Sequence, residues 1–223
     1  MDKVGRVRTR AKIIVSFVAV IVLLIGLFII YRYNYIPHWK YSNSDFGITP
    51  YVSSFDKDSD GIDDQTDILI GVRAYLDSKP KYKSKYYTTG YPDDEYGVCT
   101  DVVVNGLLEA GYDLRELVDA DIKQYPDDYH IESPDKNIDF RRVANLKVYF
   151  RRNAISLTTD ITKIEEWQAG DIVVWEHHVG IISDNRNAQG IPFVLHNASV
   201  FQADYEEDIL SMWGKIIGHY RIS

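Results

Sequence analysis

An apolar run near the N-terminus constrains this chain most, because no water-exposed fold can carry it uncovered. Residues 13–30 are interrupted only by Ser16 and Gly26, and a helix of this length nearly spans a hydrocarbon layer roughly 30 Å thick. The run is longer than the apolar region of a typical signal peptide, and no small-residue cleavage site follows it. We therefore expect an uncleaved transmembrane anchor at residues 13–31, with a signal peptide as the alternative.

The residues on either side of the run orient it in the membrane. Five basic side chains lie within residues 1–12, only Arg32 and Lys40 closely follow the run, and tyrosines at positions 31, 33 and 35 form an interfacial aromatic belt. The excess of positive charge places the N-terminus in the cytoplasm. The sequence thus predicts a single-pass protein of the cell membrane, with a cytoplasmic basic tail at residues 1–12, a stalk at residues 32–55 and an extracytoplasmic domain at residues 56–223.

Composition restricts what the outer domain binds and how it is stabilised. The 223 residues are 45% hydrophobic and 13% aromatic, which is typical of a globular protein. The basic tail carries +4 in a chain of net charge −8, so the remaining residues carry −12. So acidic a body repels phosphate groups, which argues against a nucleic-acid partner. A single cysteine excludes an internal disulfide, so core packing must stabilise the domain.

An aspartate-rich loop begins the outer domain. Carboxylates stand at positions 1, 3, 5, 9 and 12 of residues 56–67, and Gly61 stands at position 6. This spacing matches loops that wrap oxygen ligands around calcium, and it is similar to the loops of dockerin and thrombospondin repeats. The candidate calcium ligands are Asp56, Asp58, Asp60, Asp64 and Asp67.

Two features of this loop depart from the calcium pattern. The closing residue is Asp67 rather than a longer glutamate, and Ile62 is followed by an acid at position 8. The alternative is a solvated acidic turn in which Asp63, Asp64 or Thr66 caps the next helix. The sequence leaves both interpretations open.

Hydrophobic periodicity predicts helices first and strands afterwards. We expect helices over 66–77, 99–110, 114–123 and 140–152, the last with a basic outer face that begins at Arg141. Beyond residue 169 the period changes from 3.6 to 2, and short β-rich runs occupy 172–175, 178–183, 193–197 and 216–222. Helices that precede strands in this way indicate an α+β fold with an antiparallel sheet.

Cys99 and three histidines are the candidate catalytic residues. A thiol at the start of a helix faces unpaired backbone N–H groups, which lower its pKa and make it nucleophilic, although a lone cysteine also serves as a small buried hydrophobe. A hairpin would bring His178, at the head of one strand, close to His196, near the end of the next. The adjacent His177 and His178 point to opposite faces of a strand, so they do not form a zinc site.

A set of motifs in a fixed order resembles the domain of unknown function 1287 family, which is related to the NlpC-type, papain-like cysteine peptidases and amidases of bacterial cell walls. The motifs are Gly97–Val103, Asn145–Phe150, Gly170–Val173, His178–Asp184, Leu195–Asn197 and Gly218–Arg221. The resemblance implies a papain-like fold in which Cys99 is the nucleophile, His178 the general base and His196 the residue that orients the base. The substrate-binding candidates are Tyr91, for which Tyr87 is an alternative, together with Asp101 and His177.

Residues and resemblance together predict a membrane-anchored extracytoplasmic cysteine hydrolase. It would cleave amide bonds in peptidoglycan or other cell-wall peptides by a Cys-His-His mechanism, with no cofactor required for catalysis and calcium as a structural ion. The alternatives are a non-enzymatic wall-binding or calcium-stabilised interaction module on a decayed hydrolase scaffold, and acyl transfer by the same residues.

Overall fold

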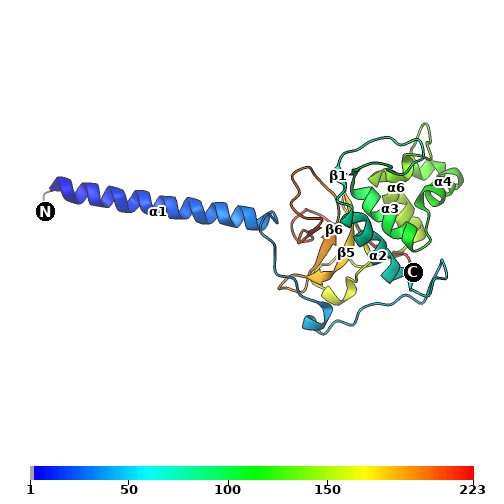
Figure 1. Ribbon diagram of the computed structural model, residues 1–223, viewed down its shortest axis with the longest axis horizontal. Coiled ribbons are helices and arrows are strands. Elements are labelled where there is room, and N and C mark those ends of the chain that lie inside the picture. Colours follow the sequence, from blue (N-terminus) through cyan, green and yellow to red (C-terminus); the bar gives the residue numbers. More distant parts are fainter. Residues whose placement is uncertain (1–2) are drawn as a thin grey trace. The chain divides into compact units, whose positions relative to one another are not determined.

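The chain forms two compact units in a computed structural model that describes residues 3–223, with side chains from Arg10 onward (Figure 1). The first unit ends at His38, and the second covers Trp39–Ser223. Most of the predicted basic tail at residues 1–12 lies outside the residues whose side chains are described.

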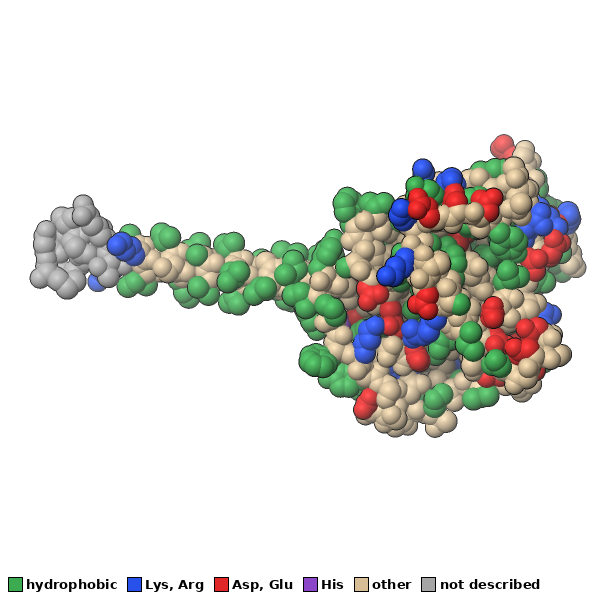
Figure 2. Space-filling model, viewed as in Figure 1, with side chains coloured by type: hydrophobic (Ala, Val, Ile, Leu, Met, Phe, Trp, Pro, Cys, Tyr) green, Lys and Arg blue, Asp and Glu red, His purple; other side chains and the backbone are tan. Residues whose placement is uncertain are grey.

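Helix α1 (Lys3–Arg32) contains the apolar run. The stretch Arg10–Arg32 is long and apolar enough to cross a membrane, and none of it is buried within the chain. Figure 2 shows hydrophobic side chains along its length. An N-terminal signal sequence has the same properties, so the structure establishes an apolar helix of membrane-spanning length and leaves its topology as a prediction.

The second unit is a mixed α+β domain, as predicted. Its α-helices are α2 (Asp64–Asp77), α3 (Cys99–Glu109), α4 (Leu114–Gln124), α5 (Pro126–Tyr129) and α6 (Val143–Asn153). Short 3-10 helices are η1 (Asn43–Phe46), η2 (Asp139–Arg141) and η3 (Ile164–Glu166).

An antiparallel sheet of six strands follows the helices, in the order β3-β8-β4-β5-β6-β7. Its strands are β3 (Ile155–Ser156), β4 (Ile172–Val174), β5 (Val179–Arg186), β6 (Pro192–Leu195), β7 (Glu206–Glu207) and β8 (Gly218–Arg221). A separate parallel pair, β1 (Lys81–Tyr82) and β2 (Tyr96–Gly97), leads into α3. The predicted runs correspond to β4, β5, β6 and β8, whereas β3 and β7 are two-residue strands too short to show an alternation.

The sheet separates two hydrophobic cores because side chains alternate along its strands. Ile172 and Val174 of β4 join the larger core, to which α2, α3, α4 and α6 contribute. Val173, between them, joins a smaller core that contains Trp167 and Trp175. Burial of every residue in β4 and β6 explains why these strands read as continuous apolar runs.

Helices α2 and α3 cross with their backbones in contact. A Cβ placed on Gly71 of α2 would lie 3.2 Å from the Cα of Gly106, and a Cβ on Gly106 of α3 would lie 2.9 Å from the carbonyl oxygen of Ile68. Each glycine therefore leaves room for the other helix. This crossing holds α3, and with it the cysteine at its first residue, close to α2.

The N-terminal end of α3 is held by a buried ion pair. Asp101 accepts a hydrogen bond from the backbone N–H of Val98 at 2.8 Å, and its two carboxylate oxygens pair with Nε and Nη2 of Arg141 at 2.5 and 2.9 Å. The two side chains are 0% and 2% exposed. This removes Arg141 from the predicted basic outer face, because the residue precedes α6 in η2 and its side chain is buried.

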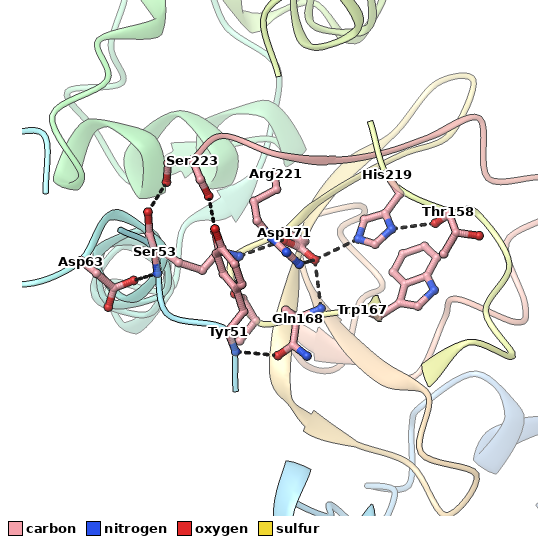
Figure 3. Close-up of polar contacts among 12 residues, drawn as sticks. Tyr51, Ser53, Asp63, Thr158, Trp167, Gln168, Asp171, His219, Arg221 and Ser223 are labelled. Carbon is pink, nitrogen blue, oxygen red and sulfur yellow. Dashed lines mark hydrogen bonds and ion pairs between the residues drawn. The ribbon is translucent and has the colours of Figure 1, made fainter. Parts of the chain in front are cut away.

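Residues 39–55 are part of the folded domain, which corrects the predicted stalk at residues 32–55. Tyr41 forms a β-bridge with Arg186 of β5. Figure 3 shows how the segment ends: the Ser53 N–H donates to Asp63, and the Ser53 hydroxyl donates to the Ser223 hydroxyl at 2.8 Å. Because these polar groups find partners in the domain, the segment packs instead of extending away from it.

A buried polar cluster accounts for His219, which lies on β8. Asp171 accepts from Nε and Nη2 of Arg221 at 2.7 and 2.8 Å, and its Oδ2 lies 3.0 Å from Nε2 of His219 (Figure 3). The His219 ring also stacks on Trp167, with ring centroids 3.8 Å apart. This histidine therefore has a structural role in the cluster.

We expect Arg141→Met to destabilise the domain by about 3–5 kcal/mol, because it leaves the Asp101 carboxylate buried without its cation. All four tryptophans lie in residues 39–223, so urea unfolding of the full chain in detergent, followed by tryptophan fluorescence, measures this change. Lys81→Met is the matched control because it breaks an ion pair with Glu95 whose side chains are 65% and 55% exposed. Equal effects of the two substitutions would contradict this role of the buried pair.

Candidate active site

The structure places Cys99 at the first position of α3, with Val98 as the N-cap. A Cβ on Gly97 would lie 2.0 Å from the hydroxyl of Tyr75, so only glycine fits at the turn into the helix. The sulfur faces the backbone N–H of Val179, the first residue of β5, as well as the N–H of Thr100. The helix start therefore meets the sheet beside His178, which directly precedes Val179.

The electrostatics of the thiol differ from the prediction. Cys99 is 8% exposed and belongs to the larger core, and this burial raises its pKa to about 11 although the Val179 N–H acts to lower it. The loss of hydration raises the thiol pKa by more than the backbone N–H groups at the helix start lower it, because apolar surroundings solvate a thiolate poorly. The expected lowered pKa is thus corrected, and the resting sulfur is a neutral thiol.

The structure brings His178 and His196 together. Nε2 of His178 lies 3.2 Å from Nδ1 of His196, and the rings are nearly perpendicular, with centroids 5.1 Å apart. The antiparallel register, which pairs Ile181 with Leu195, sets the start of β5 against the end of β6. The indole of Trp213 contacts both rings at centroid distances of 4.7 and 5.0 Å.

Both histidines are held in the neutral form. Burial, followed by the neighbouring His196, moves the pKa of His178 well below its usual value. Burial lowers the pKa of His196 to about 3. Within the described part of the chain no hydrogen bond joins Cys99 to either ring, and none uses Nδ1 of His178. Contacts between catalytic groups often tighten only when substrate binds.

Glu207 of β7 extends this row of side chains. Its Oε2 lies 3.2 Å from Nε2 of His196, and both side chains are almost fully buried. The sequence offered no signal for it, because Glu207 lies in an acidic run that is typical of a solvated loop. Only its two-residue pairing with β6, Val194 opposite Glu207, turns the side chain toward the histidines.

The amide of Gln202 helps decide where the His196 ring carries its proton. Its oxygen accepts from the N–H of Ala198 at 2.6 Å, so its nitrogen faces the carbonyl oxygens of Asp204 and His196 at 2.7 and 3.2 Å. These two carbonyls use both amide hydrogens, although the amide nitrogen also lies 3.2 Å from Nε2 of His196. The ring N–H of His196 is therefore directed at Glu207.

This arrangement determines the protonation of His178. With Nε2 of His196 protonated, its Nδ1 is an acceptor and takes a hydrogen bond from Nε2–H of His178. The remaining nitrogen of His178, Nδ1, then carries a lone pair. A neutral imidazole with a free lone pair is able to act as a general base.

The predicted substrate-binding residues do not gather at these histidines. Asp101 is buried in its ion pair with Arg141, which corrects its prediction as a substrate contact. The Tyr91 hydroxyl donates to Asp113, the N-cap of α4, and its ring packs on Phe140. His177 is exposed, and of the three it is the one with a side chain in solvent.

A cavity of about 460 Å³ lies beside the site. It is lined by Lys81, Tyr82, Tyr96, Asn197, Gln202 and Tyr205, among others. Asn197 donates to the carbonyl oxygens of Pro80 and Gly97 at 2.9 and 3.2 Å, so the cavity borders the turn into α3. Gln202 borders His196 from the same cavity. The cavity is therefore lined by residues that adjoin both the turn into α3 and His196.

The acidic loop divides its predicted ligands into two groups. Carboxylate oxygens of Asp56, Asp58 and Asp60 lie within 4.8 Å of one another. Asp64, by contrast, accepts from the N–H of Lys57 at 2.8 Å and from the hydroxyl of Tyr112 at 2.5 Å. It therefore holds the fold together rather than facing the three exposed acids.

Two further acids of this loop have different surroundings. Asp63 is the N-cap of α2 and accepts from the N–H of Thr66, as the capping interpretation predicted. Burial and, after it, the nearby carboxylates of Asp60 and Asp58 together raise the pKa of Asp67 to about 6.

Comparison with known proteins finds the family model described as "Domain of unknown function (DUF1287)", which matches residues 71–222. "Uncharacterized protein YijF" of Escherichia coli (strain K12) is 37% identical over 167 residues, which cover 69% of this chain and 80% of that protein. No solved structure matches the chain. The family match includes the cysteine and both histidines and begins after the acidic loop.

The stability of the domain should fall as the pH drops from about 6.5 toward 3. Because His178 and His196 stay neutral in the folded state, the unfolded chain binds more protons in this range. The raised pKa of Asp67 has the opposite effect, because the folded chain binds that proton more readily than the unfolded chain does. The two histidines outweigh it, since they account for two protons and Asp67 for one. Urea unfolding at pH 5.0 and 6.5 measures the slope. His196→Gln should flatten it and His177→Gln should not, and an unchanged slope in His196→Gln would refute the buried neutral pair.

The raised pKa of Cys99 predicts slow alkylation. At pH 7.5 iodoacetamide should modify the folded full chain about a hundredfold more slowly than free cysteine, since two pKa units remove that share of thiolate. The rate should climb with pH toward 11 and recover in urea. Faster reaction than free cysteine at mildly acidic pH would instead show a preformed thiolate.

Proposed function

This chain belongs to the DUF1287 family, and we propose that its folded domain is a cysteine hydrolase that cleaves amide bonds in peptidoglycan peptides. The observation that carries the proposal is the meeting of the α3 N-terminus with the His178–His196 pair. The resemblance to NlpC-type, papain-like enzymes supports the same assignment. Helix α1 would anchor the domain at the outer face of the membrane.

The chemistry follows from a neutral resting state. Nδ1 of His178 takes the proton of the Cys99 thiol while Sγ attacks the carbonyl carbon of the scissile amide. His178 then gives this proton to the leaving nitrogen as the C–N bond breaks, which leaves an acyl thioester on Cys99. A water molecule, deprotonated by His178, attacks the thioester, releases the carboxylic acid and restores the thiol.

The residues behind His178 favour the proton transfer. The imidazolium that forms keeps its Nε2–H bond to Nδ1 of His196, and Glu207 holds His196 in the required tautomer. The backbone N–H of Cys99, at the start of α3, would stabilise the oxyanion. Because the thiol is neutral at rest, His178 acts as a general base in the attack, without a stored thiolate.

The cavity suits a short peptide. Tyr82 and Tyr96 offer apolar ring faces, while Lys81 and Asp204 offer charges of both signs. Stem peptides of the cell wall carry both carboxylates and amines, so both kinds of contact would be used. A flat aromatic ligand or a polyanion would fit poorly in a cavity with this lining.

One observation favours the alternative of a non-catalytic wall-binding module on a hydrolase scaffold. Cys99 is only 8% exposed and sits within the larger core, as a structural cysteine does. A hydrolase requires the Cys99 thiol, whereas a module that only binds the cell wall would keep its function when the thiol is removed.

Cys99→Ala and His178→Ala should each abolish hydrolysis of muropeptides, with losses of at least a thousandfold, because nucleophile and base act as one unit. The assay incubates the full chain in detergent with a muropeptide digest and follows new amino groups and fragments by mass spectrometry. His130→Asn, at an exposed histidine after α5, is the control and should keep full activity.

Glu207→Gln should lower kcat more than KM, since it disturbs proton transfer rather than binding. Hydrolysis that survives in Cys99→Ala would refute Cys99 as the nucleophile, whereas a wild-type chain that binds muropeptides without cleaving them would favour the binding module. Conjugates formed with an added acceptor amine would identify acyl transfer.

A further inference from the structure

The acidic loop carries a group of charges for which the proposed hydrolase has no use. Asp56, Asp58 and Asp60 are exposed, and their oxygens lie within 4.8 Å of one another. Among the described residues, no ion pair links any of the three to lysine, arginine or histidine. The neighbouring Lys57 instead places its ammonium 4.9 Å from the ring centre of Tyr112. Backbone N–H groups of Asp60, Gly61 and Ile62 donate to these carboxylates, but no cationic side chain of the described residues balances the charge of the group.

A buried carboxylate next to this group has no partner either. Asp67, in the first turn of α2, is 3% exposed, and its Oδ2 has no hydrogen-bond partner. The charges around it are acidic: Asp60, Asp58 and Asp56 from the loop and Glu109 from α3. Removing a carboxylate from water without a donor or a cation is costly, so this side chain indicates a missing positive partner.

The other buried carboxylates of the domain show what is missing. Asp101 is paired with Arg141, Asp171 with Arg221, and Asp121 with Arg152. Glu206 is likewise held by Lys40 and Arg73. A buried acid without a cation, such as Asp64, instead accepts hydrogen bonds, here from the Lys57 N–H and the Tyr112 hydroxyl. Asp67 differs because its surroundings supply only further carboxylates.

We propose that the loop at residues 56–67 binds one calcium ion through the carboxylates of Asp56, Asp58, Asp60 and Asp67. The donor set is oxygen only, which selects a hard cation. Calcium accepts several protein carboxylates in irregular loops, whereas magnesium keeps most of its water and uses one or two. Asp63 and Asp64 are left out of the set because side-chain hydroxyls of the domain, those of Thr66 and Tyr112, hold their carboxylates. Over residues 10–223, whose side chains are described, the three exposed acids accept only from backbone N–H groups of their own loop.

The ion would fasten the loop to the helix pair that carries the active site. Asp67 belongs to α2, which crosses α3. At the other end of α3, a Cβ on Gly111 would lie 3.1 Å from the Cβ of Asp58, so the loop also lies against the C-terminal end of that helix. The calcium ion would have a structural role, and its binding does not depend on the proposed hydrolysis.

Calorimetric titration of the metal-free full chain in detergent with CaCl₂ tests the proposal. We expect one ion per chain with a Kd between about 10⁻⁴ and 10⁻³ M, the range of extracellular calcium modules. The melting temperature should rise with CaCl₂ and return to its starting value with a chelator. Cys99→Ala should bind calcium as the wild type does, which separates this site from the hydrolase.

Asp67→Asn is the decisive variant, because it keeps the shape and removes a buried charge. It should melt no lower than the metal-free wild type yet bind calcium at least tenfold more weakly, and Asp58→Asn should also weaken binding. Asp127→Asn, in an exposed acidic turn elsewhere, is the control and should bind normally. Absence of saturable heat up to 10 mM CaCl₂, undiminished affinity in Asp67→Asn, or an equal melting shift with MgCl₂ would overturn the calcium site.

Discussion

The contact between the first turn of α3 and the beginning of β5 is the constraint on which the rest of this domain depends. It sets the Cys99 sulfur against the backbone N–H of Val179 and leaves His178 beside it. Two devices hold the contact: the glycine crossing of α2 and α3, and the ion pair that ties Asp101 to Arg141. The crossing fixes the side of α3, and the ion pair fixes its first turn. In the proposed mechanism, this keeps the Cys99 thiol at a constant position relative to His178.

Burial gives this site its particular electrostatic character. The thiol is harder to ionise than free cysteine, and both imidazoles are harder to protonate than free histidine. Each shift has the same main cause, the loss of water around a charged form. The groups therefore rest as neutral partners, and in the proposed mechanism charge separates only when a carbonyl group is present to accept the sulfur. Glu207 and His196 prepare His178 for that moment by fixing which nitrogen carries the proton.

Local pattern was sufficient for those features that depend on neighbours in sequence. Ile68, Val72 and Leu76 predicted the buried face of α2, and hairpin geometry alone predicted that His178 and His196 meet. Features that depend on distant packing were missed. Arg141 looks like part of a solvated basic face until η2 turns it toward Asp101. The raised pKa of the thiol and the approach of Glu207 likewise follow from tertiary burial, which carries no periodic signal. The papain-like relationship remains part of the proposal.

The most direct test of the account is to look for the covalent intermediate on the sulfur itself. The full chain is mixed with a muropeptide digest, quenched in acid within seconds and digested, and the fragment containing Cys99 is weighed by mass spectrometry. We expect a thioester-linked peptide acyl group on Cys99. It should build up during turnover, disappear when substrate is exhausted and not form in His178→Ala. Cleavage of muropeptides with Cys99 unmodified at every time point would contradict it.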